Sequence, residues 1–558
     1  MIKDSTLQAS HGYTQDFKSN NEVKCDSMTF NHIDATPCDA NNIARPCCSS
    51  TIETHMKRQG ALQSFPLRQE LNSRTGNAHP AMKTEKLKHS HEAIGQSQRH
   101  PRRGKELDIY PHKHHLKSKI TSLKTAKTLK SDVINEEGAR IIVFPEYGLY
   151  GLGWSRQTIA PYLEYIPDPN EQQWNPCEKP YLYNSTEVQN ILSCMAQQSS
   201  IFVVANMGAC NPCNKSDPKC PADSQYQYSA NVVYGPNGDF LARYFKYNLY
   251  VEEKHFDKPV TVDLITFETP FGRFGTFSSL DILYHDPAIT LINKMNITNI
   301  AFPTAWVDEL PLLSAIEFHS SFAMGMHTNF LVANLHLPNA GYHGSGLYWT
   351  WETTLGAAYY YNDSLTSKGS LVVDTLTPSV LQSHSIKEQQ SRSSSINRRQ
   401  DLSETLEATI NGDRYTAIVL QSSYGLLNVC QHDLCCILEY EGGFSTKELY
   451  VFGAFDGMHI KEERFYLQAC VLIQCANNSK DSCGSPSKKS SSYMSKMVLK
   501  GNFTSKYAFP EVLTSQDGIP GLVTQGWGYD VETLIIEVGS GGGPLSISLL
   551  SRDYSRDK

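Results

Sequence analysis

The sequence predicts an α/β fold followed by a smaller β-rich domain. Short apolar runs typical of buried strands begin at Ala139, and they alternate with helix-length segments such as Glu187 to Gln197. Beyond residue 413, strand-like runs are separated by turn residues without a long helical pattern, which predicts a β-rich unit. A length of 558 residues is sufficient for two or three folded units with tails.

Four segments follow along the chain. Residues 1–115 are polar and basic without hydrophobic periodicity, so we expect a disordered or non-native segment. Its cysteines are expected to be unpaired or disordered: Cys25, Cys38, Cys47 and Cys48. Residues 116–382 carry the α/β strands, residues 383–412 form a linker rich in Ser, Arg and Gln, and residues 413–558 form the C-terminal domain. The strands are expected in the runs ARIIVFPE, SIFVVANMG, ANVVYG, TNIAFPTAW and TNFLVANLH, then in YTAIVLQS, ELYVFGAF, YLQACVLIQC and ETLIIEVG.

Charge and hydropathy restrict the partners. A net charge of -7 gives no electrostatic case for binding nucleic acid or an anionic membrane, and it favours small neutral ligands. No run of about 18 apolar residues occurs, so no transmembrane segment is predicted. The basic residues between 80 and 130 allow one hypothesis of nucleic-acid recruitment, which predicts that binding weakens strongly as the salt concentration rises. No other feature of the sequence supports this hypothesis.

The cysteines indicate an oxidising compartment. Eleven of the 15 fall into clusters at residues 177–220 and 430–483, which predicts disulfides and secretion. The alternative is a cytosolic protein with free thiols. Although the chain starts without the apolar core of a signal peptide, six glycosylation acceptors also favour secretion: Asn184, Asn214, Asn296, Asn362, Asn477 and Asn502. Neither Cys210-x-x-Cys213 nor the histidines at 112–115 is predicted to bind a metal, and no cofactor is expected.

Three strand ends carry groups suited to catalysis. Glu146 closes the IIVFPE run as a candidate general base, or as a strand-end charge facing water. Lys246 lies among aromatic residues, where a desolvated amine can stabilise an oxyanion; a surface lysine is the alternative. Ser279 follows a Gly-rich strand at Phe274 to Phe277, in a turn that can expose a nucleophile beside backbone N–H donors.

Several sequence segments around these residues resemble those of a known family. The stretches IIVFPEYGLYG, ARYFKYNLY, FGRFGTFSSLDILYHDPA and VFGAFDGMHIKEERFYLQAC look like those of the vanin and biotinidase (pantetheinase-like) branch of the nitrilase, or carbon-nitrogen hydrolase, superfamily. The resemblance implies a nitrilase-type αββα sandwich and a vanin-type C-terminal domain. It also implies Glu146 as general base, Lys246 as stabiliser of the tetrahedral intermediate and Glu253 as the supporting carboxylate.

The chain departs from the family at two points. Ser279 stands where the family has its nucleophilic cysteine, and a carboxylate that can activate a thiol of pKa ~8.5 leaves a hydroxyl far from ionised. His285 and His319 are interpreted as structural, because neither is at a position that the family uses as a base. The family's opening strand is also not recognisable beyond a faint likeness at Leu107 to Tyr110, and its absence would leave the strand at Ala139 with an unpaired edge.

Weak or lost activity towards a small-molecule amide is therefore expected. One alternative is an active secreted amidase that hydrolyses pantetheine-like or biotinyl amides with Ser279. The other is a non-catalytic ligand-binding or scaffold protein.

Overall fold

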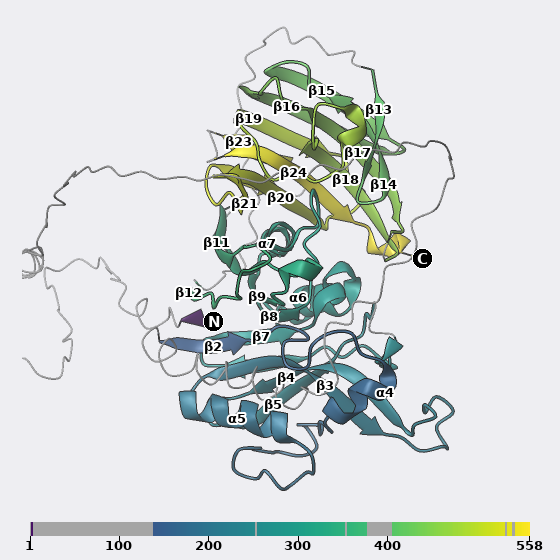
Figure 1. Ribbon diagram of the computed structural model, residues 1–558, viewed down its shortest axis with the longest axis vertical. Helices are drawn as coiled ribbons and strands as arrows, with labels where there is room; N and C mark the ends of the chain where they lie inside the picture. The colour runs from purple at the N-terminus through teal and green to yellow at the C-terminus, as the bar shows by residue number, and fades with distance from the viewer. Residues whose placement is uncertain are drawn as a thin grey trace, which may run out of the picture. The chain divides into compact units, whose positions relative to one another are not determined.

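Two six-stranded sheets form the first domain of the computed structural model, which describes residues 2–3, 138–250, 254–351, 354–376, 404–461, 463–530, 533–537 and 542–557 (Figure 1). The first sheet has the order β12 (Asp374–Thr375), β1 (Ile2–Lys3), β2 (Ala139–Val143), β3 (Phe202–Pro212), β4 (Gln225–Tyr234) and β5 (Phe240–Phe245). The second has the order β11 (Thr354–Tyr360), β10 (Ser345–Trp351), β9 (Asn329–Asn334), β8 (Asn299–Thr304), β7 (Gly272–Thr276) and β6 (Thr266–Thr269).

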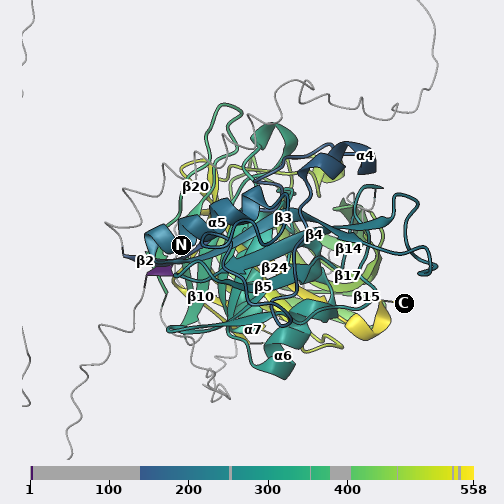
Figure 2. The same ribbon diagram turned by 90° about the horizontal axis from the view of Figure 1, so that it is seen from below.

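The two sheets pack face to face between helices. Both faces of β3 are covered, because Phe202 and Val204 point into the core between the sheets while Val203 and Ala205 point towards α5 (Glu187–Ser199). Figure 2 shows α5 across the sheet that contains β3 and β4. The outer face of the second sheet packs on α6 (Thr290–Met295) and α7 (Ala315–Met326). This helix–sheet–sheet–helix order confirms the predicted αββα sandwich.

The C-terminal domain is β-rich, as predicted, and consists of two antiparallel sheets. The seven-stranded sheet has the order β13 (Leu406–Ile410), β14 (Asp413–Val419), β17 (Tyr450–His459), β18 (Phe465–Gln474), β24 (Gly543–Arg552), β20 (Ala508–Gln516) and β21 (Ile519–Leu522). The five-stranded sheet has the order β15 (Tyr424–Gln431), β16 (Leu434–Gly443), β19 (Tyr493–Gly501), β23 (Thr533–Glu537) and β22 (Trp527–Asp530). Among the described helices, including the four-residue α4 (Arg156–Ile159), none is long and apolar enough to cross a membrane.

The segment boundaries differ in part from the predicted ones. Strand β13 lies inside the predicted linker at 383–412, because the alternating apolar residues Leu406, Ala408 and Ile410 directly follow its polar run. The edge of β2 that the absence of an opening strand would leave unpaired forms an antiparallel pairing with the two residues of β1, Ile2 and Lys3. The rest of the predicted N-terminal segment, with its cysteines, lies outside the described residues.

Disulfide bonds join ten of the clustered cysteines. One of them links β16 to β18 in the buried interior of the C-terminal domain, and cross-links of this kind constrain the unfolded chain. The pairs are Cys177–Cys194, Cys213–Cys220, Cys430–Cys435, Cys436–Cys470 and Cys475–Cys483. Cys213 thus belongs to a disulfide-bonded loop, as expected. Cys210 is the free cysteine of the described residues.

Helix α7 is the main contact of the α/β domain with the C-terminal domain, and it packs on β20. The rings of Phe322 and Phe509 stack with centroids 5.6 Å apart. Gly325 permits a close approach, since a Cβ atom there would lie 2.5 Å from the carbonyl oxygen of Ala508. A helix-interior glycine disfavours the helix by about 1 kcal/mol, and the tight packing offsets this.

Two buried carboxyl groups lie in this interface. Glu317 of α7 accepts hydrogen bonds from Ser314 and Ser546, and Glu511 of β20 accepts one from Ser548 at 2.8 Å. Both are fully buried. Burial raises the pKa of Glu511 to about 8, and burial together with the charge of Glu511 raises the pKa of Glu317 well above its ordinary value. The folded protein therefore favours the protonated forms.

We predict that the free energy of unfolding falls as the pH rises from about 4.5 towards 8, because a carboxyl group with a raised pKa binds more protons in the folded state than in the unfolded state. Glu511→Gln mimics the protonated carboxyl group and removes its titration. The decrease in the free energy of unfolding between about pH 4.5 and 8 should then be smaller, by about 1.4 kcal/mol for each unit by which folding raises the pKa of Glu511. Urea unfolding at pH 5.5, 7.0 and 8.5 measures the effect. The control is Glu268→Gln, on an exposed side chain. An unchanged pH dependence in Glu511→Gln would contradict the prediction.

Candidate active site

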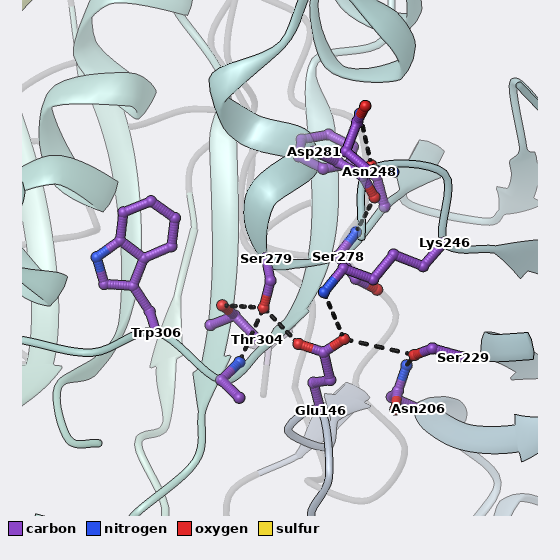
Figure 3. Close-up of polar contacts among 12 residues, drawn as sticks. Glu146, Asn206, Ser229, Lys246, Asn248, Ser278, Ser279, Asp281, Thr304 and Trp306 are labelled. Atoms are coloured by element: carbon purple, nitrogen blue, oxygen red, sulfur yellow. Dashed lines mark hydrogen bonds and ion pairs between the residues drawn. The ribbon is translucent and has the colours of Figure 1, made fainter. Parts of the chain in front are cut away.

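Glu146, Lys246 and Ser279 lie together at the ends of three strands (Figure 3). Glu146 follows β2 and Lys246 follows β5, so the first sheet contributes both charged groups. Ser279 follows β7 of the second sheet and begins a 3₁₀ turn, η3 (Ser279–Leu283). The site is thus formed where the two sheets face each other.

Glu146 and Lys246 form an ion pair that is almost fully buried. The Nζ atom of Lys246 lies 3.0 Å from Oε1 of Glu146, and each side chain is 1% exposed. The hydroxyl of Ser229 lies 3.4 Å from the same oxygen, and the hydroxyl of Ser279 donates to Oε2. Both carboxylate oxygens therefore have partners, as a buried charge requires.

The hydroxyl of Ser279 is held on three sides. It donates to Glu146, accepts from the backbone N–H of Ala305 at 3.0 Å, and lies 2.9 Å from the hydroxyl of Thr304. Since the single Ser279 proton points to Glu146, the Thr304 hydroxyl must be the donor in the third bond. The backbone of Ser279 has φ 43°, the left-handed conformation that is unfavourable for a residue with a Cβ atom.

A layer of buried amides connects the two sheets beneath the site. Asn231 of β4 accepts from Asn206 and from the Ser278 hydroxyl, and it donates to the Thr276 hydroxyl and the Phe277 carbonyl. All four hydrogen-bonding positions of its amide are used, so the network is satisfied without water. This network fixes the end of β7, and hence the start of the Ser279 turn, against the first sheet.

Asp281 holds the Ser279 turn against the Lys246 segment. Its carboxylate accepts from the Ser278 N–H at 3.0 Å, the Asn248 N–H at 3.0 Å, the Asn248 amide at 2.9 Å and the Tyr244 hydroxyl at 2.7 Å. Burial raises the pKa of Asp281, and the charge of Lys246 opposes that shift. The sequence interpretation assigned Asp281 no role, although the Ser278-x-x-Asp281 spacing is that of a capping box.

The far end of the same turn is held by the C-terminal domain. The guanidinium of Arg552, on β24, donates to the Leu283 carbonyl at 2.8 and 3.1 Å and pairs with Asp557 at 2.8 Å. Its planar group also lies over the rings of Phe465 and Tyr554. Both domains therefore determine the position of the segment that carries Ser279.

A cavity of about 150 Å³ opens onto the three residues, and both domains line it. Residues of the α/β domain in its wall are Glu146, Tyr147, Lys246, Tyr250, Ser279, Leu280, Leu283, Ala305, Trp306, Val307, Glu309, Leu313 and Tyr342. The C-terminal domain contributes Asn411, His459, Lys461, Glu463 and Phe465. None of these five residues was predicted from the sequence, because no short sequence pattern indicates which segments of the C-terminal domain will line the cavity.

The other expected residues lie elsewhere. Glu253 lies outside the described residues, so the supporting carboxylate stays a prediction. His285 is on the surface beside Asp286, and His319 is buried in α7, where burial lowers its pKa to about 3. Neither lines the cavity. Within the described ranges, no three His, Cys, Asp or Glu side chains group as metal ligands would.

Comparison with known proteins gives matches for both domains. Residues 85–317 match the family described as carbon-nitrogen hydrolase, and residues 404–540 match the vanin C-terminal domain. Pantetheinase of Mus musculus is 41% identical over 427 residues, which cover 76% of this chain and 81% of the relative. Pantetheinase of Homo sapiens is 40% identical over 428 residues, with the same coverage. Biotinidase of Homo sapiens is 36% identical over 451 residues, covering 76% of this chain and 81% of the relative.

We predict that Asp281→Asn destabilises the fold by about 2–4 kcal/mol, because an amide NH₂ in place of one carboxylate oxygen leaves two buried donors without an acceptor. Tyr244→Phe removes one donor instead and should cost about 1 kcal/mol. Urea unfolding followed by tryptophan fluorescence measures both. A loss below about 1 kcal/mol for Asp281→Asn would show that the turn does not depend on this carboxylate.

Proposed function

The chain belongs to the vanin and biotinidase type of carbon-nitrogen hydrolase, and on this premise we propose that it binds a linear amide above Ser279 and hydrolyses it slowly or not at all. Proteins named pantetheinase, pantetheine hydrolase and biotinidase are among its relatives, which supports a pantetheine-like or biotinyl amide as the ligand. Ligand binding needs the cavity, whereas hydrolysis also needs an activated nucleophile.

Each residue has a role in the reaction that the family membership suggests. A nucleophile at position 279 attacks the amide carbonyl carbon while Glu146 takes its proton, and the carbonyl oxygen becomes an oxyanion. Lys246 is close enough to Glu146 to share the site and to stabilise that oxyanion. Glu146 then returns the proton to the leaving amine, and water hydrolyses the acyl-enzyme by the same steps.

The observation that carries the proposal is the environment of the Ser279 hydroxyl. A serine hydroxyl has a pKa much nearer that of water (~15.7) than that of a thiol (~8.5), so a carboxylate is a weak base for it. The N–H of Ala305 and the hydroxyl of Thr304 also occupy the lone pairs that would attack a carbonyl. The serine oxygen must lose one of these bonds before it can react.

An active serine-based amidase is the second candidate. The direct hydrogen bond from Ser279 to Glu146 favours it, because a nucleophile must contact its base. No described histidine stands between the two groups, so this candidate lacks the oriented imidazole that serine hydrolases use. If the protein that we propose binds the amide but does not hydrolyse it at all, it is a ligand-binding protein without catalysis.

Secretion is part of the proposal. The five disulfides are suited to an oxidising compartment. Asn362 is half-buried, and the other acceptor asparagines are exposed, as glycosylation requires: Asn184, Asn214, Asn296, Asn477 and Asn502.

We predict slow or undetectable hydrolysis of a fluorogenic pantetheine-type amide by the wild type, and a rate at least about tenfold higher for Ser279→Cys, since each pKa unit removed from the nucleophile is worth about 1.36 kcal/mol. Turnover is measured at matched concentrations of folded protein, with Ser279→Ala as the control.

Fast turnover by the wild type that Ser279→Ala abolishes would establish serine as the nucleophile and contradict the proposal. No gain for Ser279→Cys would mean that another part of the site, and not the serine, prevents the reaction.

A further inference from the structure

The outer part of the cavity wall has a different chemistry from the inner part. Glu146, Lys246 and Ser279 at the bottom are at most 4% exposed. At the mouth, the side chains of Lys461 and Glu309 are 40% and 33% exposed. Leucine, tryptophan and phenylalanine side chains complete the wall: Leu280, Leu283, Trp306, Leu313 and Phe465. A ligand that fills the cavity therefore meets a polar reacting end, apolar surface and a second polar end.

His459 provides one oriented hydrogen-bonding atom in the part of the wall that the C-terminal domain contributes. Its Nδ1 lies 2.7 Å from Oδ2 of Asp413, and the two side chains are 7% and 5% exposed. The imidazole also stacks on Phe465, with ring centroids 4.7 Å apart. The tautomer in which Nδ1 donates its proton to the Asp413 carboxylate presents Nε2 as a hydrogen-bond acceptor. That nitrogen has no hydrogen-bond partner among the described residues, and His459 lines the cavity.

Lys461 provides a charged donor beside it. Its Nζ lies 3.0 and 3.2 Å from the two carboxylate oxygens of Glu309, so the pair joins the two domains at the cavity mouth. An ion pair as exposed as this one contributes little to stability, about 0–1 kcal/mol. The ammonium can therefore turn to a ligand oxygen at low cost.

From this arrangement we infer that the C-terminal domain supplies a second recognition subsite, formed by His459 and Lys461, for the end of the ligand remote from the scissile amide. That end carries a hydroxyl or amide N–H, which donates to Nε2 of His459, and a carbonyl or carboxylate oxygen, which accepts from Lys461. The inference rests on the proposed binding of a linear amide. It makes the C-terminal domain a determinant of ligand choice.

Two probes separate the subsite from the rest of the cavity. Pantetheine has hydroxyl and amide groups remote from the amide bond next to its thiol-bearing end, and N-acetylcysteamine has the thiol-bearing amide alone. Binding of each to the full chain is measured by tryptophan fluorescence, because Trp306 lines the cavity. The variants are His459→Phe, which keeps the stacked ring, Lys461→Met and Lys461→Arg. Lys496→Met is the matched control, since Lys496 forms a similarly exposed 3.0 Å ion pair with Glu439 away from the cavity.

We expect His459→Phe and Lys461→Met each to weaken pantetheine binding by about 3- to 10-fold, the size of one lost hydrogen bond, with N-acetylcysteamine unaffected. Lys461→Arg should retain most of the affinity, and Lys496→Met all of it. Unchanged pantetheine binding in both test variants would overturn the subsite, and so would an equal loss for both probes, which indicates a structural role.

Binding of N-acetylcysteamine without tighter binding of pantetheine by the wild type would overturn the subsite alone. If the wild type binds neither probe, the proposed function fails and the subsite inference fails with it.

Discussion

The buried ion pair of Glu146 and Lys246 is the constraint on which the rest of the site depends. Moving two charges out of water costs several kcal/mol per ion, and the attraction between them repays this only when the geometry is good and the remaining lone pairs are filled. The 3.0 Å contact requires the C-terminal ends of β2 and β5 to lie at the same end of the first sheet. The second carboxylate oxygen requires a donor from the other sheet, and Ser279 is that donor. The buried ion pair is therefore stable only when the two sheets pack so that both supply its hydrogen-bond partners.

This view explains how the site remains well formed with a serine at position 279. Any residue here must offer a hydrogen to Glu146, and a hydroxyl does so at least as well as a thiol. The Ser279 oxygen in turn accepts from the Ala305 N–H and the Thr304 hydroxyl, so a serine here leaves no buried polar atom of this group without a partner. Structural integrity and chemical reactivity are thus separable at this position, because hydrogen bonding depends on the proton present and nucleophilic attack on the ease of losing it.

The C-terminal domain is part of the site as well as its neighbour. Arg552 holds the Leu283 carbonyl at the end of the Ser279 turn, and Tyr284 donates to Glu463 at 2.7 Å. The contact of α7 with β20 contains the buried carboxyl groups of Glu317 and Glu511, and burial raises the pKa of both. The position of the Ser279 turn, the cavity wall and the domain interface are consequently coupled through a few buried polar contacts.

The sequence by itself indicated an α/β unit followed by a β-rich unit and placed Glu146, Lys246 and Ser279 at strand ends, because hydrophobic periodicity and strand ends are local features. The αββα sandwich followed only from the resemblance to the vanin and biotinidase branch. The sequence also determined which cysteine clusters would pair. Only the tertiary structure decided the role of Asp281 towards Asn248, 33 residues away, and the inclusion of His459 and Lys461 in the cavity. These depend on contacts between segments far apart in the chain, and no local spacing of residues encodes which side chains will meet when the sheets and domains pack.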